Sequence, residues 1–415
     1  MKRTAYLVVT LGLCLTAGLL SQSCSKDELG DSIFDVREYP LDQNSITFPL
    51  DTFCKANFLE KYNLKYLYKM QDIGSDMNYN LVPCTYDQSI TLAVLCKYLW
   101  YDVYHDSIDY QGGELFLKKY SPRIIHVIGS PAFNPAQGTE VLGTAEGGLK
   151  ITLYNANNLS PANIDYMNEY FFKTMHHEFS HILNQNANRP NEFDRISNGK
   201  YNAVNWNDTH ELVALGQGFV SPYASSQAGE DWVEVIANYI VKDTITWNEM
   251  LVNASYQWEF VTDVDAAYWR KIDQKVNKGQ ANRDTVGFFV RETSTSGGEA
   301  ATYGIVRMAV QRDEDNKYAV PDADGNIVYL HTSGVIGDEV IRQKLDMVRT
   351  WLADYFDMDL EKIRMGVQRR QWLTDGNGDF VFDPDGNFIN NITYVREDGT
   401  TVLDSLRNQV LRFKK

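Results

Sequence analysis

The sequence has few cysteines, five among 415 residues, and no two of them are separated by only two positions. Zinc sites built from thiolates use such closely spaced pairs, so a site of this kind is not expected. Apart from Cys14 and Cys24 near the N-terminus, the chain has Cys54, Cys84 and Cys96. These three can form at most one disulfide.

Positive charge is also scarce. The chain has 39 Lys and Arg against 55 Asp and Glu, which gives a formal net charge of −16. Nucleic-acid binding proteins present basic surfaces to phosphate groups. The acidic composition therefore argues against a nucleic acid as a partner and favours a soluble surface.

Long apolar runs are absent too, and the one at residues 6–20 is too short to span a membrane comfortably. It follows Lys2 and Arg3, so residues 1–23 predict a signal peptide. The next segment, Leu20-Ser21-Gln22-Ser23-Cys24, resembles the cleavage box of bacterial lipoproteins. This resemblance implies cleavage before Cys24 and lipidation of its thiol, with acyl chains as the only membrane anchor. Ordinary secretion is the alternative.

The residues after Cys24 point to a location. Ser25-Lys26-Asp27-Glu28 resembles the export signal of Bacteroidetes surface lipoproteins. The resemblance implies an outer-membrane lipoprotein exposed on the cell surface, with residues 24–45 as a lipidated tether. A solvated tether without an export signal is the alternative. Cleavage also removes the charges of Lys2 and Arg3, so the formal net charge falls to near −18.

Hydrophobic periodicity predicts helices and a few short strands. Helices are expected at residues 87–105, from Ser160 to about 186, near 210–215, from Ser225 onward, and at 264–278, 338–356 and 359–371. Strands are expected at 123–129 and 149–154. Asp-Gly pairs after residue 372 predict a small hairpin or meander. No internal repeat is apparent.

Residues 177–181 have the pattern H-E-x-x-H. Ser160 and Pro161 suit the start of a helix, and its apolar stripe (Met167, Phe171, Met175, Phe179, Ile182) leaves His177 and His181 on another face. Two imidazoles one turn apart can bind one zinc ion, and Glu178 can act on a water molecule that the zinc activates. A chance occurrence of the pattern is the alternative.

Zinc hydrolases use three protein ligands, and no histidine follows His181 at the short spacing of some families. An acidic residue on a second helix is therefore the remaining candidate for the third zinc ligand. Glu230 and Glu234 are one turn apart, so one carboxylate can bind zinc while the other orients a ligand imidazole. Solvated acids at the start of a helix are the alternative.

These two segments together resemble the gluzincin metallopeptidases. The resemblance implies that Glu230 is the zinc ligand and Glu234 the partner of a ligand histidine, with the opposite assignment left open. Tyr223 lies seven residues before Glu230, as does a tyrosine in the metalloprotease domain of anthrax lethal factor. This implies that the Tyr223 hydroxyl stabilises the oxyanion of the reaction. A core aromatic is the alternative.

With the lipoprotein N-terminus and the run Gly218–Tyr223, the chain resembles the substrate-import-associated zinc metallohydrolase lipoproteins, also described as putative zinc-binding metallopeptidases. The resemblance implies an α+β, zincin-like domain at residues 46–245, with a small mixed sheet, the motif helix and a Glu-bearing helix. Residues 246–415 are expected to be mainly helical, with a short β tail and no assigned role.

The implied function is a surface-anchored zinc peptidase that acts on peptides or proteins, with Glu178 as general base. The family context implies a TonB-dependent importer and its surface binding lipoprotein as partners in nutrient import. The alternatives are a non-catalytic binding lipoprotein and a zinc hydrolase of non-peptide esters or amides. The strand at 149–154 is a candidate sheet edge for aligning an extended peptide, with a core strand as the alternative.

Overall fold

The computed structural model describes residues 41–70, 79–108, 112–134, 139–141, 143–146, 149–262, 288–292, 303–316 and 318–414. The predicted signal peptide, Cys24 and the predicted helix at 264–278 lie outside these ranges. Contacts between residues divide the chain into Met1–Ser45 and Ile46–Lys415. The description below concerns the second unit. In the described part, no helix has the length and apolar character needed to cross a membrane.

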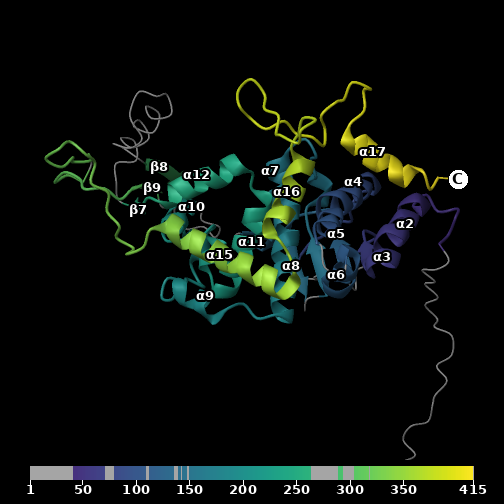
Figure 1. Cartoon of the computed structure of the whole chain (residues 1–415), viewed down its shortest axis with the longest axis horizontal. Coiled ribbons are helices and arrows are strands. Elements are labelled where there is room, and N and C mark those ends of the chain that lie inside the picture. The colour runs from purple at the N-terminus through teal and green to yellow at the C-terminus, as the bar shows by residue number, and fades with distance from the viewer. Residues whose placement is uncertain are drawn as a thin grey trace, which may run out of the picture. The chain divides into compact units, whose positions relative to one another are not determined.

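Helices dominate this unit (Figure 1). They are α2 (Phe48–Cys54), α3 (Glu60–Tyr62), α4 (Tyr86–Cys96), α5 (Asp102–Ser107), α6 (Gly112–Tyr120), α7 (Ile164–Met167), α8 (Lys173–Asn186), α9 (Asn191–Ile196), α10 (Glu211–Gly216), α11 (Ala228–Val241), α12 (Thr244–Ala254), α15 (Gly337–Phe356), α16 (Leu360–Gln371) and α17 (Val402–Leu411). The predicted helices at 87–105, 210–215, 338–356 and 359–371 are confirmed within one or two residues at each end.

The strands in the described ranges form three small sheets. The first sheet has the strand order β1 (Lys65–Leu67), β2 (Ile124–Val127), β6 (Lys150–Leu153) and β5 (Gly143–Glu146). The second pairs β3 (Ala132–Asn134) with β4 (Thr139–Val141). The third has the order β7 (Trp258–Thr262), β9 (Tyr303–Met308) and β8 (Phe288–Glu292). In the first sheet β1, β2 and β6 are parallel, and β5 is antiparallel to β6. Helices and small mixed sheets together agree with an α+β class.

The prediction that residues 149–154 form a sheet edge is wrong. These residues form β6, which is hydrogen-bonded to β2 on one side and to β5 on the other. Its apolar alternation reflects burial, so the alternative, a core strand, is correct. The end of the sheet is β5, whose residues Gly-Thr-Ala-Glu give no apolar alternation that sequence analysis could detect.

The motif helix starts later than predicted. Asn163 caps it, because its side-chain oxygen accepts the backbone N–H of Tyr166 at 2.9 Å, and Ser160 and Pro161 lie in the preceding turn. α7, a π-helical turn at Asn168–Phe172 and α8 then follow without a break. Asparagine is as good a cap as serine, so the two sites could not be ranked from the sequence.

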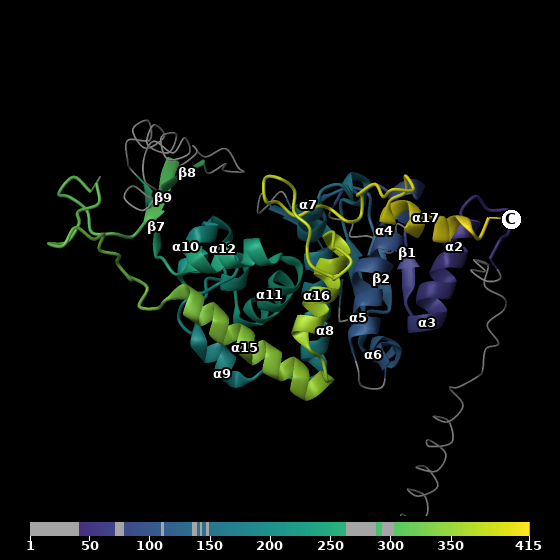
Figure 2. The same cartoon turned by 45° about the horizontal axis from the view of Figure 1, so that its top comes forward.

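One large core joins most of these elements. Its members run from Leu50 to Val410 and include residues on both sides of position 245. α11 packs against α8, α15 and α16, and Figures 1 and 2 show these four helices gathered together. The boundary after residue 245, which stays a prediction, would therefore divide a shared core. Cys54, Cys84 and Cys96 are buried free thiols.

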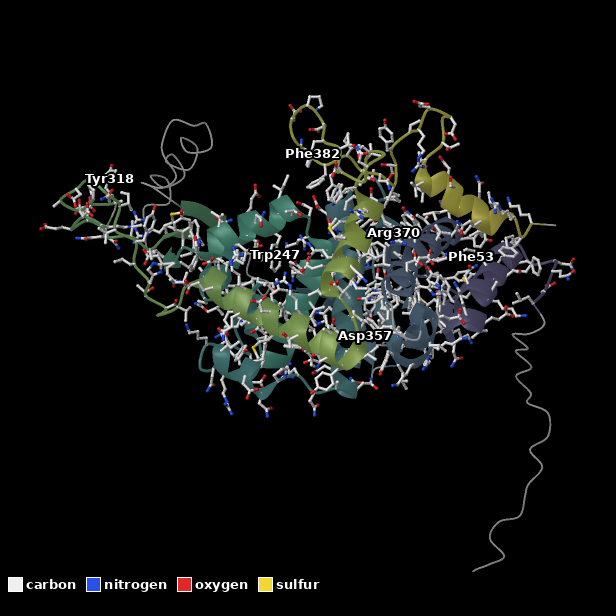
Figure 3. The ribbon with its side chains drawn as sticks, in the orientation of Figure 1. Phe53, Trp247, Tyr318, Asp357, Arg370 and Phe382 are labelled. Carbon is white, nitrogen blue, oxygen red and sulfur yellow. The ribbon has the colours of Figure 1, made fainter. Side chains whose placement is uncertain are left out.

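Residues 310–329 and 372–390 share one looped arrangement. Each contains three isolated bridges, Val310–Tyr329, Arg312–Ala319 and Pro321–Ile327 in one and Trp372–Asn390, Thr374–Phe380 and Phe382–Phe388 in the other. The isolated bridges after residue 372 agree with the small hairpin or meander expected there, but residues 372–414 form no extended strand, and the tail ends in α17, a helix that was not predicted. The related segment at 310–329 was missed. The shared sequence D-x-D-G-N at 322–326 and 383–387 was its signal. Tyr318 and Phe382 lie on these segments, as labelled in Figure 3.

Candidate metal centre

Two adjacent helices carry the candidate site. α8 holds His177, Glu178 and His181, and α11 holds Glu230 and Glu234. The predicted apolar stripe on the motif helix is buried, from Met167, Phe171, Met175 and Phe179 with no exposed surface to Ile182 with 5%. Burial of this face fixes the rotation of α8, so that the two imidazoles point toward α11. His177 and His181 therefore lie one turn apart on a single helix, as the sequence predicted.

Three donor atoms converge between these helices. Glu230 Oε2 lies 3.0 Å from His177 Nε2 and 3.2 Å from His181 Nε2. One ligand atom from each of the three residues lies within 4.8 Å of the other two. Within the described residues, this is the one group of histidine, cysteine and acidic side chains with such an arrangement. The structure therefore brings together the two histidines and the acid expected from the sequence.

The donor set fits zinc in number and type, and two of its spacings also agree with a zinc site. Zinc binds His nitrogen and carboxylate oxygen at about 2.0–2.2 Å, so neighbouring ligands of a tetrahedral site lie about 3.3 Å apart. The distances of 3.0 and 3.2 Å at Glu230 are close to this value. Three protein ligands leave one position of the tetrahedron open, as in hydrolytic zinc sites.

Glu234 contacts the far side of the His177 ring. Its Oε1 lies 2.8 Å from His177 Nδ1, while its Oε2 accepts hydrogen bonds from Ser221 Oγ at 2.6 Å and Asn238 Nδ2 at 3.1 Å. A proton on Nδ1 that is donated to Glu234 leaves the lone pair of Nε2 directed at the convergence point. The carboxylate thereby sets both the tautomer and the orientation of the ring.

Three of these supporting residues were missed from the sequence. Gln227 donates to Glu230 Oε1 at 3.2 Å, and its position three residues before Glu230 is a helical spacing that could have indicated it. Asn238 lies four residues after Glu234 and gave the same kind of signal. Ser221 comes from the segment before α11, and no spacing rule connects it to Glu234.

The charges of the site are strongly coupled. Burial lowers the pKa of His177, but hydrogen bonds that its ring donates to Glu230 and Glu234 outweigh this effect and raise it to about 10, so a zinc ion must displace the proton from Nε2 before this nitrogen can act as a ligand. Burial raises the pKa of Glu230, but hydrogen bonds with His177 and His181 reverse this and leave it lowered. Burial also raises the pKa of Glu234, but the charge of Lys173, followed by the hydrogen bond with His177, leaves it lowered to about 2. The acids are therefore ionised and ready to bind a cation.

Glu178 has a different environment. Burial raises its pKa above the usual glutamate value, and the nearby His177 and His181 oppose the rise without cancelling it. A general base that works near neutral pH benefits from such a shift. The pKa of Glu178 is therefore shifted in the direction that favours proton uptake near neutral pH.

Tyr223 lies at the opening of the site. Its ring centroid is 5.8 Å from that of His177 and 4.9 Å from that of Trp206, and the residue is 37% exposed. Burial, followed by the charge of Glu230 and a hydrogen bond with it, raises the pKa of the Tyr223 hydroxyl. The side chain is thus a neutral donor near the ligand acid and does not belong to the core. Trp206, which packs against it, was not identified from the sequence.

Comparisons with known proteins point to a zinc-binding family. A family model described as "putative zinc-binding metallo-peptidase" matches residues 44–361. A crystal structure described as a putative zinc-binding metallo-peptidase from Bacteroides caccae ATCC 43185 is 30% identical, with a TM-score of 0.52; the alignment covers 79% of this chain and 93% of that one. No curated protein matches.

Proposed function

Since the chain belongs to the family of putative zinc-binding metallo-peptidases, it is a zinc metallopeptidase in general terms, and we propose that it is one of the gluzincin type. The observation that carries this proposal is the convergence of His177 Nε2, His181 Nε2 and Glu230 Oε2. These three residues are the zinc ligands, and Glu234 is the partner that orients His177. The contact between Glu234 and Nδ1 supports this assignment over the reverse one.

Peptide hydrolysis needs a base, an acid and a group that stabilises the oxyanion. Bound zinc supplies a Lewis acid that lowers the pKa of a water molecule toward neutrality. Glu178 would take the proton from this water as the water oxygen bonds to the carbonyl carbon, and would pass that proton to the nitrogen of the leaving amine when the C–N bond breaks. The raised pKa of Glu178 suits both steps, because the same carboxyl group must accept and then release a proton.

The Tyr223 hydroxyl is placed to donate a hydrogen bond to the carbonyl oxygen as it becomes an oxyanion. Its raised pKa keeps the proton on the hydroxyl at neutral pH. Replacing Tyr223 with phenylalanine is expected to lower kcat by about 10²–10³-fold and to leave zinc content unchanged. Peptidase assays with metal analysis test this, and Tyr355→Phe, at an exposed position on α15, is the control. An unchanged rate would remove Tyr223 from the mechanism.

The substrate backbone is proposed to add to the sheet along β5. This strand ends the order β1-β2-β6-β5 and is antiparallel to its neighbour. Gly143 at its start lies so close to α8 that an added Cβ would be 2.3 Å from Thr174 Cγ2, one turn before His177. An extended peptide paired with β5 would therefore run next to the motif helix.

Surface anchoring through Cys24 and a role in nutrient import with a TonB-dependent importer and its binding lipoprotein remain part of the proposal. They are supported by the N-terminal sequence, Lys2 to Glu28. The expected location is the outer leaflet of the outer membrane, with the peptidase unit outside the cell.

A peptide-library digest tests the peptidase proposal. The zinc-loaded protein should cleave a defined subset of peptides, chelation should abolish cleavage, and added zinc should restore it. A zinc-loaded protein that spares all peptides but hydrolyses esters or amides on glycans would support the non-peptide alternative. A protein that binds zinc yet turns over neither class would support the binding lipoprotein.

A further inference from the structure

A fully buried ion pair lies next to the ligand acid. Lys344 Nζ on α15 is 2.6 Å from Asp231 Oδ2, and neither side chain has exposed surface. Asp231 follows Glu230 directly in the first turn of α11. The hydroxyl of Tyr201 donates to the same Oδ2 at 3.0 Å. A buried ion pair contributes little net stability compared with apolar packing, so stability alone is a weak explanation for it.

The same ammonium group also contacts the segment that leads to the other side of the site. Lys344 Nζ donates to the carbonyl oxygen of Gly218 at 2.7 Å and lies 4.3 Å from the ring centroid of Phe219. This segment continues to Ser221, which donates to Glu234, and to Tyr223. Lys344 therefore contacts both α11, which carries Glu230 and Glu234, and the segment that carries Ser221 and Tyr223.

α15 approaches this segment closely through glycines. Gly218 has φ +86°, and an added Cβ would lie 2.4 Å from Val340 Cγ1 of α15. At Gly337, the start of α15, an added Cβ would lie 2.2 Å from the carbonyl oxygen of Leu215. The absence of side chains at these two positions lets α15 pack directly on the backbone of residues 215–218, which limits how far that segment can shift.

From these contacts we infer that Lys344 is a positioning residue for the metal site: it fixes the first turn of α11, and hence Glu230, against the segment that carries Ser221 and Tyr223. The inference rests on the zinc site proposed above. It also gives part of the region after residue 245 a role, because α15 is then needed for the geometry of the site. Without the ammonium group, the buried Asp231 carboxylate would be left with Tyr201 as its main partner.

Zinc affinity of the full chain is the property to measure. Lys344→Met removes the charge and is expected to weaken zinc binding by about 10–100-fold, the range found when residues that orient metal ligands are replaced. Arg364→Met is the matched control. Arg364 is also a buried cation, 5% exposed, and it contacts α11 at its other end, where it donates to the carbonyl oxygen of Tyr239. This control should lose stability but keep its zinc affinity.

Two further variants distinguish positioning from general destabilisation. The double variant Asp231→Asn, Lys344→Met removes both charges and should recover part of the lost affinity, because no unpaired carboxylate remains buried. Tyr201→Phe removes only one hydrogen bond to Asp231 and should give a smaller loss of affinity in a folded protein. The visible absorption of the cobalt-substituted proteins reports the ligand geometry directly and should change in Lys344→Met.

The inference is overturned if the wild type binds zinc and folded Lys344→Met binds it equally tightly with an unchanged cobalt spectrum. It is also overturned if Arg364→Met weakens zinc binding as much as Lys344→Met does. If Lys344→Met does not fold, the inference is overturned when Tyr201→Phe and the double variant both bind zinc as tightly as the wild type. A wild-type protein that binds no zinc would overturn the proposed function as well.

Discussion

Replacing Glu178 with glutamine should lower kcat/KM for a cleaved peptide by about 10²–10⁴-fold while the protein keeps its zinc. Glutamine has the same shape as glutamate, so the packing of α8 is preserved, but its amide cannot take up the proton of the attacking water. The three proposed ligands are untouched by this change. Steady-state kinetics on a peptide from the library digest, together with metal analysis of the same preparation, measure both parts of the prediction.

Glu192→Gln is a suitable control for this variant, because Glu192 is an exposed acid on α9, outside the two helices that carry the site. It should keep both rate and zinc. Undiminished turnover in Glu178→Gln would remove Glu178 from the role of general base. Loss of zinc from Glu178→Gln would mean that the residue helps to hold the metal, contrary to the proposed ligand set.

Removal of either histidine has the second largest expected effect. The wild-type protein should contain about one zinc ion per chain, and His177→Ala and His181→Ala should each reduce this to near zero, since two ligands do not retain zinc against exchange. His177→Ala also removes the partner of two buried carboxylates, Glu230 and Glu234, and should therefore unfold at a lower temperature than His181→Ala. Metal analysis and thermal unfolding test these points.

His176→Gln is the matched control, because His176 is the neighbour of His177 on the same helix. Its ring has no exposed surface, and its Nδ1 lies 2.9 Å from the Tyr104 hydroxyl. Burial lowers its pKa to about 3, so the ring is neutral and part of the core. This variant should keep its zinc. Full zinc content in both His177→Ala and His181→Ala would rule out the proposed site.

The two acids can be separated in the same assay. Glu230→Ala should lose zinc, whereas Glu234→Gln should retain a site weakened by about 10–100-fold, as expected for a residue that orients a ligand. The reverse order of effects would show that Glu234 is the ligand and Glu230 its partner. The sequence left both assignments open, since the residues share one helix face.

The part of the site that lies on single helices was readable from the sequence. His177, Glu178 and His181 are spaced so that one helix places them together, and the apolar stripe through Phe179 predicts which face is buried. The same holds for Glu230 and Glu234, one turn apart on α11. Helical geometry alone relates such residues, so no knowledge of the fold was needed.

Other parts could not be read in this way. The helix start was placed at Ser160 instead of after Asn163, because serine and asparagine are equally good caps. The edge strand β5 was missed, because it lacks apolar alternation. Ser221 and Trp206 contact the site from other segments, at sequence separations that no periodicity encodes.

The sequence by itself determined which side chains are available for chemistry: two imidazoles and a glutamate at helical spacing in residues 177–181, two acids one turn apart at residues 230 and 234, and an acidic composition. The tertiary structure decided that Glu230 lies against the Nε2 atoms of both histidines, whereas Glu234 lies against Nδ1 of His177. It also placed Lys344 of α15 against Asp231, 113 positions earlier in the chain. The physical reason is that helical periodicity relates only residues a few positions apart, whereas a metal site and a buried ion pair depend on how distant helices pack.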